Sequence, residues 1–515
     1  MPTRPNVLFI ISDQHHAKCL GHAGHPQVRT PHLDRLAREG VRFANAVANN
    51  PICTPSRMCY LSGQYVHNHG YYGLSGQNPG GLPTLFGQFR RAGYRTAAIG
   101  KLHGPAGWIE ADTDVCLEAY AQLSVSGHSA YDDYLRGLGL DGDRDDGFLQ
   151  EQGPDAPHQT VEARPSRLPY VHSVEGWCVQ EARRFIAGAG DRPWMMQVSL
   201  PRPHEIYAPA QEFWDLYDDD SLWLPPNTDA DLTGKAPHLR RTRAGYNDPR
   251  GMLFAPKTYE ALRRRKQHGY LGCVSHVDHA VGELLEALDA ARLAPNTIVI
   301  YTADHGDYAS EFGILEKAPG ICGDAICRIP SLWRWPGRFA AGHAPASIVE
   351  TVDLAPTLCA LCGLDPMPTA DGVALTPLLE GGERAAHTIG VTENPWSKAV
   401  LKGDWRLVHY PRGFFASDPA APEDFGELYN LADDPWERWN LYFDPACRDR
   451  RAELERDLLD WLITTTRIRT MLPPVLARDG DNNPVWGGEV FNHHWDADGK
   501  LSWRAVAANA GGNYI

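Results

Sequence analysis

Residues 6–14 read Asn-Val-Leu-Phe-Ile-Ile-Ser-Asp-Gln, and this stretch indicates most directly how the chain folds. Its continuous apolar and β-branched run over residues 6–11 is typical of a strand that is buried on both faces. A second such run, Thr297–Thr302, lies far along the chain, and each run is followed by an acid, Asp13 or Asp304. We therefore predict an α/β fold with a large, mostly parallel sheet.

Strand and helix patterns alternate through the first half of the chain, as expected for such a sheet. Thr30 and Pro31 predict the N-cap and first turn of a helix that ends at Gly40. Further strands are predicted at 94–99 and 194–200, and further helices at 82–91 and 259–291. Residues 112–169 are rich in Asp, Gly and Pro, which predicts long surface loops or an insertion.

The sequence pattern changes beyond about Gly381. Short strands are predicted at 389–391, 399–410 and 427–431, and a helix at 452–465. We expect a catalytic domain at 1–385, a small C-terminal α+β subdomain at 386–470 and an extended arm at 471–515. The arm has no clear periodicity, so we expect it to pack on a partner subunit or, alternatively, to wrap over its own subunit.

Composition limits the partners of the protein. The 515 residues carry a formal net charge of −15, which disfavours nucleic acid or an anionic membrane as a partner. No segment approaches the roughly 20 apolar residues of a membrane span. The eleven cysteines, without a signal peptide, indicate reduced thiols and a cytoplasmic location. Cys359 and Cys362 have C-x-x-C spacing without a second pair, so we expect buried core residues there.

Two acids follow the predicted buried strands and point to a metal site. Asp13 is followed by Gln14, and Asp304 by His305. Ligand sites of open α/β sheets gather beyond the carboxyl ends of strands, so these side chains should converge. Oxygen-rich ligation with one imidazole suits Ca²⁺, Mg²⁺ or Mn²⁺, and the imidazole favours Mn²⁺. The alternative is that each acid only caps a helix or turn.

The pentapeptide Cys53-Thr54-Pro55-Ser56-Arg57 has the C-x-P-x-R spacing that formylglycine-generating enzymes recognise. These enzymes oxidise the thiol to an aldehyde, whose hydrate carries two hydroxyl groups on one carbon. Thr54 and Ser56 are expected at the start of a helix whose N-terminus faces a bound anion.

Together these motifs resemble the type I, formylglycine-dependent sulfatase family of the alkaline phosphatase superfamily. The matching segments, in the order of the family, are Asn6–Gln14, Thr30–Asp34, Cys53–Arg57, Leu61–Gln64, Gly100–His103, Pro203-His204, Thr302–Asp307 and Lys317. They span about residues 5–360, and Glu427–Trp439 resembles the C-terminal subdomain of the family. The resemblance implies an alkaline-phosphatase-like α/β/α sandwich, with the small subdomain and the extended tail appended.

The resemblance also implies a metal-dependent mechanism. One divalent metal is bound by Asp13, Gln14, Asp304 and His305, together with the modified Cys53. A hydroxyl of the hydrated aldehyde attacks sulfur and forms a covalent sulfate hemiester. Loss of the proton of the second hydroxyl then expels sulfate and restores the aldehyde.

The remaining roles follow from the same resemblance. Arg57 holds the hydrate, Lys101 binds the sulfuryl oxygens and His103 takes the proton of the second hydroxyl. His204 and Lys317 lie on the leaving-group side, as proton donor or charge stabiliser. Taken singly, these are residue types that occur as ordinary surface lysines and loop histidines.

Gln14 and His305 depart from the commoner sulfatase pattern, which has Asp and Asn at these positions. The two residues resemble the branch that contains choline sulfatases and phosphonate monoester hydrolases. That branch often has an Asn where this chain has Gly73-Leu74, so its substrate contacts do not transfer. One carboxylate fewer leaves the site more positive, which suits phosphonate or phosphate diesters as further substrates.

We therefore expect hydrolysis of sulfate monoesters in the manner of an arylsulfatase. The first alternative is a phosphonate monoester or phosphodiester hydrolase with the same site, and a remote one is a non-catalytic anion-binding protein with unmodified Cys53. Expected partners are a small-molecule sulfate ester, a formylglycine-generating enzyme and further copies of the chain in a dimer or tetramer. We expect the organic group of the substrate to contact loops within 112–169 and 207–252.

Overall fold

The computed structural model describes most of the catalytic and C-terminal parts of the chain. The described residues are 4–74, 81–120, 129–144, 163–246, 259–317, 321–367 and 369–467, with the short strands β14 (Ala477–Arg478) and β15 (Pro484–Val485). The predicted arm at 471–515 lies outside the described residues apart from these two strands.

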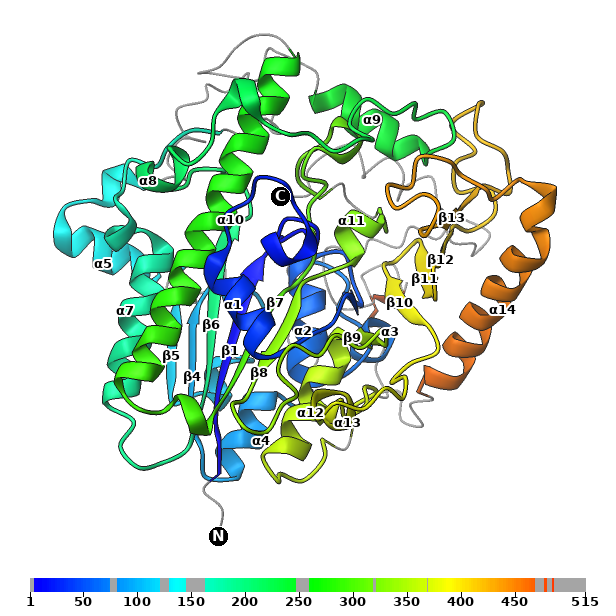
Figure 1. Ribbon diagram of the computed structural model, residues 1–515. Helices are drawn as coiled ribbons and strands as arrows, with labels where there is room; N and C mark the ends of the chain where they lie inside the picture. The colour runs from blue at the N-terminus through cyan, green and yellow to red at the C-terminus, as the bar shows by residue number, and fades with distance from the viewer. Residues whose placement is uncertain are drawn as a thin grey trace.

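A seven-stranded sheet forms the centre of the molecule, with the strand order β2-β8-β7-β1-β6-β4-β5 (Figure 1). Its members are β1 (Asn6–Asp13), β2 (Val41–Arg42), β4 (Arg95–Gly100), β5 (Val115–Glu118), β6 (Trp194–Pro203), β7 (Thr297–Ala303) and β8 (Ser331–Arg334). The run from β7 to β5 is parallel, whereas β8 is antiparallel to both β7 and β2. The predicted large, mostly parallel sheet is confirmed.

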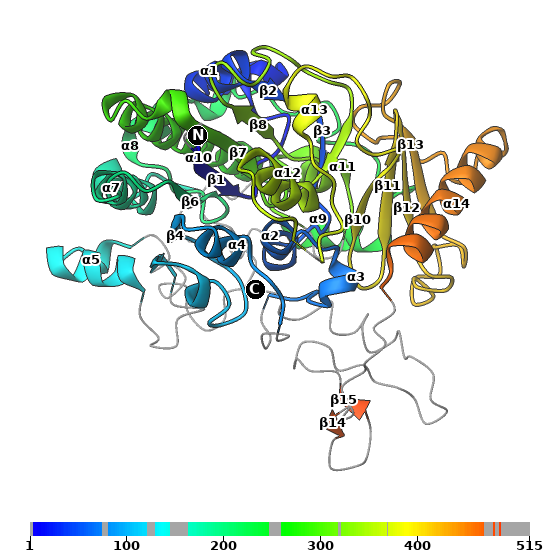
Figure 2. The ribbon, with the colours of Figure 1, turned by 90° about the horizontal axis from the view of Figure 1, so that it is seen from below.

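Helices cover both faces of the sheet (Figure 2). One face carries α1 (Pro31–Glu39), α7 (Val174–Ala187) and α10 (Tyr259–Ala290), and the other carries α2 (Cys53–Ser62), α4 (Leu85–Arg91) and α12 (Leu354–Leu361). In β1, Leu8 and Ile10 pack into the first layer, and Phe9 and Ile11 pack into the second. Because the side chains of β1 meet a core on both faces, its sequence has no polar alternation.

The start of α1 agrees with the prediction in its position but not in its capping contact. Thr30 is the N-cap residue and Pro31 the first helical residue, as predicted, but the side chain of Thr30 makes no capping hydrogen bond. Instead, the carboxylate of Asp278, on α10, accepts hydrogen bonds from the backbone N–H groups of His32 (3.2 Å) and Leu33 (2.8 Å). Burial raises the pKa of Asp278 to about 7. A distant carboxylate thus replaces the local cap.

The prediction of loops over residues 112–169 is wrong in part. Strand β5 extends the sheet beside β4, and Ser129 and Asp132 form a capping box at the start of α5 (Ala130–Leu138). Residues 121–128 and 145–162 lie outside the described residues. Helix α7, which follows this region and covers the sheet, was not predicted either.

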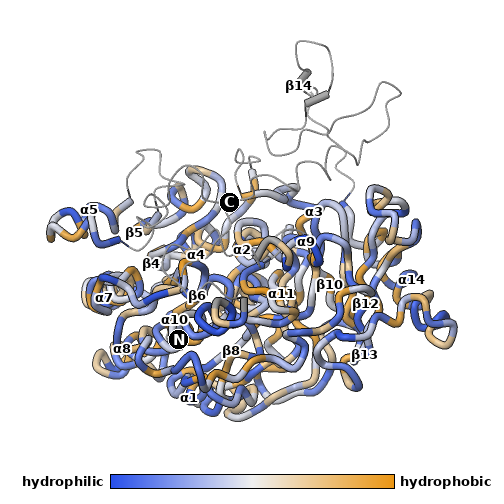
Figure 3. Tube along the Cα trace, turned by 90° about the horizontal axis from the view of Figure 1, so that it is seen from above, coloured by the Kyte–Doolittle hydropathy of each residue, from blue (hydrophilic) through white to orange (hydrophobic). Residues whose placement is uncertain are grey.

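The C-terminal part forms a four-stranded antiparallel sheet with α14 (Arg448–Thr465) on one side. Its strands are β10 (Gly390–Glu393), β11 (Lys398–Lys402), β12 (Trp405–His409) and β13 (Gly426–Asn430). Val400 and Leu407 share a hydrophobic cluster with Leu454 of α14, and the same cluster includes Cys59 of α2. Outer helices such as α7 and α14 carry both hydrophilic and hydrophobic segments (Figure 3). The predicted α+β unit therefore packs directly against the helix that begins at Cys53.

The sequence predicts no membrane span and predicts reduced thiols. Among the described residues, no helix has the length and apolar character needed to cross a bilayer. All eleven cysteines are free, and Cys359 and Cys362 are buried, as expected for core residues.

His387 joins the start of the C-terminal part to the catalytic part through an ion pair. Its Nε2 lies 2.9 Å from Asp353 Oδ2, and its Nδ1 lies 3.9 Å from Glu350 Oε2. Burial alone would lower the pKa of His387, but the carboxylates of Glu350 and Asp353 raise it to about 9. The folded-state pKa is thus above the unfolded value of about 6.5.

We predict that this pair makes folding stability depend on pH. Its contribution is complete below about pH 6.5 and is lost as the pH rises through about 9, because only the protonated ring is attracted. Between about pH 6.5 and 9, the unfolding free energy of the wild type should fall by at most about 3 kcal/mol more than that of His387→Asn. Urea unfolding at several pH values measures it, with exposed His409→Asn as the control. Parallel pH profiles for wild type and His387→Asn would contradict the prediction.

Candidate active site and metal centre

The carboxyl ends of four parallel strands meet at one edge of the central sheet. Ser12 of β1 pairs with Ala303 of β7, so Asp13 and Asp304 leave their strands side by side. The neighbouring ends of β6 and β4 add Ser199 and Lys101. The parallel register therefore brings together residues that are almost 300 positions apart in the sequence.

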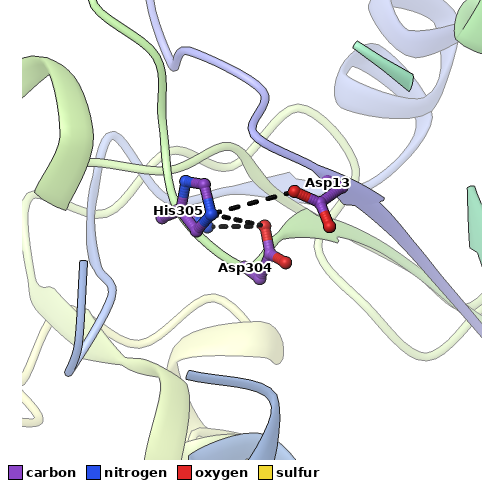
Figure 4. Close-up of side chains that lie close together, drawn as sticks. All are labelled: Asp13, Asp304 and His305. Atoms are coloured by element: carbon purple, nitrogen blue, oxygen red, sulfur yellow. Dashed lines mark hydrogen bonds and ion pairs between the residues drawn. The ribbon is translucent and has the colours of Figure 1, made fainter. Parts of the chain in front are cut away.

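Three of the predicted metal ligands point toward one another (Figure 4). One donor atom from each of Asp13, Asp304 and His305 lies within 4.8 Å of the others, and all three residues are buried. His305 Nε2 is 3.8 Å from Asp13 Oδ1 and 3.8 Å from Asp304 Oδ1. Among the described residues, neither Asp13 Oδ1 nor His305 Nε2 has a hydrogen-bond partner. Buried donor atoms without partners fit a divalent cation between them.

The alternative role as a cap applies to only part of this cluster. Asp304 Oδ1 accepts hydrogen bonds from the backbone N–H groups of Gln14 (3.0 Å) and His305 (2.9 Å). Asp13 instead contacts cationic side chains, Lys101 at 2.6 Å and Arg57 at 3.0 Å. Asp304 thus shapes its turn, while its position beside Asp13 remains suited to metal binding.

The ring of His305 is held in one orientation. Its Nδ1 lies 2.8 Å from the carbonyl oxygen of Gly306 and donates to it, which leaves the lone pair of Nε2 directed at the two carboxylates. Burial lowers the pKa of His305, which favours the neutral ring that binds metals. A Cβ atom at Gly306 would lie 1.9 Å from the carbonyl oxygen of Ala325, so only glycine fits behind His305.

Gln14 enters the site from a strained backbone position, with φ of 69°. Its Nε2 donates to Asp307 Oδ2 (2.7 Å) and Glu205 Oε2 (3.1 Å), and its Oε1 accepts from Lys317 (2.9 Å). Asp307 and Glu205 were not predicted as site residues. The sequence did hold a signal for both: Glu205 directly follows the predicted His204, and Asp307 ends the matching segment that contains the predicted His305.

Arg57 connects the two carboxylates. Its Nε donates to Asp304 (2.7 Å) and its Nη2 to Asp13 (3.0 Å), while Nη1 donates to Ser199 Oγ (2.6 Å) and the carbonyl oxygen of Lys101 (2.7 Å). Burial would lower the pKa of Arg57, but Asp304 and Asp13 raise it, so the guanidinium stays charged. Arg57 therefore fixes both acids in place.

Cys53 is the first residue of α2 and is buried. Burial, followed by the charge of Asp13, raises the pKa of its thiol, so an unmodified Cys53 is a neutral and poor nucleophile. Ser56, expected only to start the helix, donates from Oγ to the carbonyl oxygen of Asp304 (2.6 Å) and ties α2 to the end of β7. Thr54 Oγ1 donates to the carbonyl oxygen of Leu74 (3.3 Å).

Lys101 and His103 follow β4. Gly100 has φ of 106°, and a Cβ atom there would lie 2.0 Å from the carbonyl oxygen of Ser199, so the turn into Lys101 requires glycine. Burial and the nearby Lys101 lower the pKa of His103 well below its ordinary value. His103 Nδ1 is buried and has no hydrogen-bond partner among the described residues. The ring is thus neutral and able to accept a proton.

His204 and Lys317 form a pair next to Gln14, whose Oε1 accepts a hydrogen bond from Lys317. His204 Nδ1 lies 2.8 Å from the carbonyl oxygen of Glu205, and His204 Nε2 lies 3.1 Å from Lys317 Nζ. Burial lowers the pKa of His204 to about 4. Burial would also lower the pKa of Lys317, but Glu205 raises it, so Lys317 carries the positive charge of the pair. All the residues predicted for the site therefore gather at this edge of the sheet.

Comparison with known proteins identifies the architecture. The sequence profile of the family described as Sulfatase matches residues 5–364, which include both halves of the site. The chain belongs to the sulfatase family. The profile described as N-sulphoglucosamine sulphohydrolase, C-terminal, matches residues 311–463 and includes the antiparallel sheet. These matches confirm the predicted family and the enzyme class, a sulfuric ester hydrolase.

Individual relatives agree with this assignment. The choline-sulfatase of Rhizobium meliloti is 28% identical over 504 residues, which cover 93% of each chain. The arylsulfatase of Clostridium perfringens is 27% identical over 488 residues, with 88% of this chain and 94% of that protein covered. The phosphonate monoester hydrolase of Silicibacter pomeroyi superposes with a TM-score of 0.74 at 22% identity, covering 90% of this chain and 96% of that one. That likeness confirms the alkaline-phosphatase-like sandwich.

We predict that Asp13→Asn weakens divalent cation binding by at least about tenfold, because one anionic donor is lost from the cluster. Isothermal titration calorimetry with Mn²⁺ and with Ca²⁺ measures the dissociation constants. Asp278→Asn, which changes a buried carboxylate that caps α1 away from the cluster, is the matched control and should bind as the wild type does. Equal affinities for the wild type and Asp13→Asn would remove Asp13 from the metal site.

Proposed function

We propose that this sulfatase hydrolyses sulfate monoesters, of the arylsulfatase type, with a formylglycine made from Cys53 and one divalent metal ion. One observation carries the proposal: Asp13 Oδ1 and His305 Nε2, two buried atoms that can bind a metal, have no hydrogen-bond partner among the described residues. Both atoms lie in the same site as Cys53. Cations surround this site, which suits an anionic substrate despite the negative net charge of the protein.

The metal would be held by Asp13, Gln14, Asp304, His305 and the modified Cys53. Oxygen donors with one imidazole favour Ca²⁺ or Mn²⁺, with Mg²⁺ as a third choice. When bound, the ion supplies Lewis-acid polarisation of a sulfate oxygen and lowers the pKa of a hydroxyl group at neutral pH.

Residues on the nucleophile side hold the reacting groups and move one proton. The hydrated aldehyde at position 53 supplies one hydroxyl for attack on sulfur and a second whose deprotonation releases sulfate. Four of the five N–H groups of Arg57 hold the surrounding acids, Ser199 and backbone, and the fifth, which has no partner among the described residues, would hold the hydrate. Lys101 offsets charge on the sulfuryl oxygens, and neutral His103 accepts the proton of the second hydroxyl.

Lys317 and His204 act on the leaving-group side. Lys317 is the cation of this pair, so its ammonium offsets the negative charge that develops on the leaving oxygen. His204, neutral and anchored through Nδ1, orients that ammonium through Nε2. Loss of either side chain should slow substrates with poor leaving groups more than activated aryl esters.

A second candidate is a phosphonate monoester or phosphodiester hydrolase with the same residues. The observation that favours it is the neutral amide of Gln14 where many sulfatases have a carboxylate, since the site then carries one negative charge fewer. A remote candidate is an anion-binding protein in which Cys53 stays unmodified.

The proposal also covers how the protein matures, how it assembles and where it is located. A formylglycine-generating enzyme is the proposed maturation partner, recognising Cys53 to Arg57. We expect a homo-oligomer, a dimer or tetramer, and domain limits of 1–385, 386–470 and 471–515. The eleven free cysteines support a reducing compartment, the cytoplasm.

We predict that activity follows the conversion of Cys53. Co-expression with a formylglycine-generating enzyme should yield a peptide about 18 Da lighter, as its aldehyde, than the unmodified form. Cys53→Ala should lower kcat on 4-nitrophenyl sulfate by at least about a thousandfold. Cys59→Ala, in the same helix but outside the recognition sequence, is the control and should retain conversion and activity. Full activity in protein with an unconverted Cys53 would refute the nucleophile assignment.

We predict that kcat/KM is higher for a 4-nitrophenyl sulfate ester than for a 4-nitrophenyl phosphonate monoester with the same metal. Steady-state rates on fully converted enzyme measure the ratio. A reversed ratio would establish the phosphonate hydrolase alternative. Protein in which Cys53 stays unconverted despite co-expression, and which hydrolyses neither ester, would instead support the anion-binding alternative.

A further inference from the structure

We propose that Asp307 is a positioning residue that, with Glu205, turns the amide of Gln14 so that its oxygen faces the metal. The inference rests on the proposed metal site and adds two residues that bind no metal themselves. A glutamine side chain can place its amide in two orientations, because the two ends of the amide are alike in shape but only the oxygen binds a cation.

The carboxylate of Asp307 is fixed by the backbone. Its Oδ1 accepts hydrogen bonds from the backbone N–H groups of Ala309 (2.6 Å) and Glu316 (2.8 Å). Its Oδ2 accepts from Tyr207 OH (2.9 Å) and from Gln14 Nε2 (2.7 Å). Asp307 is fully buried, and these four bonds use the acceptor positions of an ionised carboxylate. It therefore offers Gln14 an acceptor and nothing else.

The hydrogen bonds at both ends of the Gln14 amide are consistent with the same orientation. Glu205 Oε2 accepts a second hydrogen bond from Nε2 at 3.1 Å, so carboxylates receive both hydrogens of the NH₂ group. At the other end, Lys317 Nζ lies 2.9 Å from Oε1, and an ammonium group can only donate. Reversing the amide would face the NH₂ group with a donor and the oxygen with two carboxylates. The orientation is therefore set by chemistry at three independent contacts.

The same contacts explain why residue 14 is an amide in this chain. A carboxylate at position 14 would lie within hydrogen-bond distance of both Asp307 and Glu205, with no hydrogen to share with either. Three carboxylates in such contact repel one another in a buried site. The residue types at positions 14, 205 and 307 are thus coupled, and Gln14 provides the metal with a neutral oxygen donor.

Asp307→Asn tests the proposal. The backbone N–H groups of Ala309 and Glu316 require oxygen at one end of the new amide, so its NH₂ group faces Gln14. Gln14 then reverses and presents its own NH₂ group to the metal. We expect Mn²⁺ and Ca²⁺ affinities, measured by calorimetry, to fall by about 10- to 100-fold. The metal-induced rise in Tm should shrink in parallel.

Glu205→Gln is the matched control, because it removes the same charge from the same amide nitrogen. The side chain of Glu205 is 23% exposed, so the replacement amide can rotate or bind water. We expect its metal affinity to fall by about threefold, much less than in Asp307→Asn, because the rotated amide can still present its oxygen to Gln14 Nε2. Tyr207→Phe removes the other donor to Asp307 Oδ2 and leaves Gln14 in place, and it should bind metal as the wild type does.

Gln14→Glu separates orientation from simple charge. If Asp307 acts only as a negative charge near the metal, Gln14→Glu adds charge and should tighten binding. In our proposal it weakens binding, because the introduced carboxylate meets those of Glu205 and Asp307. The double variant Gln14→Glu/Asp307→Asn should recover affinity to within about threefold, since the introduced amide at position 307 then donates to the carboxylate at position 14.

Each outcome decides one question. If the wild type binds neither ion, the proposed metal site fails. If the wild type binds but Asp307→Asn matches Glu205→Gln, only the positioning role fails. Should circular dichroism show that Asp307→Asn does not fold, Gln14→Glu alone decides, and tighter metal binding by that variant overturns the proposal.

Discussion

The site depends on holding two carboxylates side by side in a fully buried position. Asp13 and Asp304 leave neighbouring parallel strands, and burial alone would favour protonation of Asp13. Lys101 and Arg57 outweigh that effect and hold the pKa of Asp13 well below its ordinary value. Two acids and two cations balance in charge, so a bound divalent ion gives the site a net positive charge. That charge can attract an anionic ester to a protein whose overall charge is −15.

Strands and helices of the fold hold each residue of this site in place. Four strand ends provide the two acids, Lys101 and Ser199, and the start of α2 places Cys53 and Arg57 against them. Gly100 and Gly306 allow backbone to approach where any side chain would collide. The C-terminal sheet packs on α2 as well, so the helix that begins at Cys53 contacts both the central sheet and the C-terminal sheet.

Around the candidate metal donors lies a second set of residues, which contact the side chains of His305 and Gln14. Gly306 fixes the ring of His305 through its carbonyl oxygen, and Asp307 and Glu205 receive the amide hydrogens of Gln14. Uncharged donors such as imidazole and amide need this help, because each has an end that binds a cation and an end that does not. In the proposed metal site, the use of Gln14 in place of a carboxylate therefore involves Asp307 and Glu205 as well as Gln14 itself.

The sequence by itself determined the central strands, the convergence of Asp13 with Asp304, the family and the group of residues that gathers at the sheet edge. It could do so because double-sided burial leaves an unbroken apolar run, and because parallel strands end at one edge. Tertiary structure alone decided that Asp278 rather than Thr30 caps α1, that β5 and α5 form within residues 112–169, and that Asp307 contacts Gln14. These outcomes depend on which donor meets which acceptor across a distance of many residues. Local patterns record burial and chain direction, but they do not record those long-range partners.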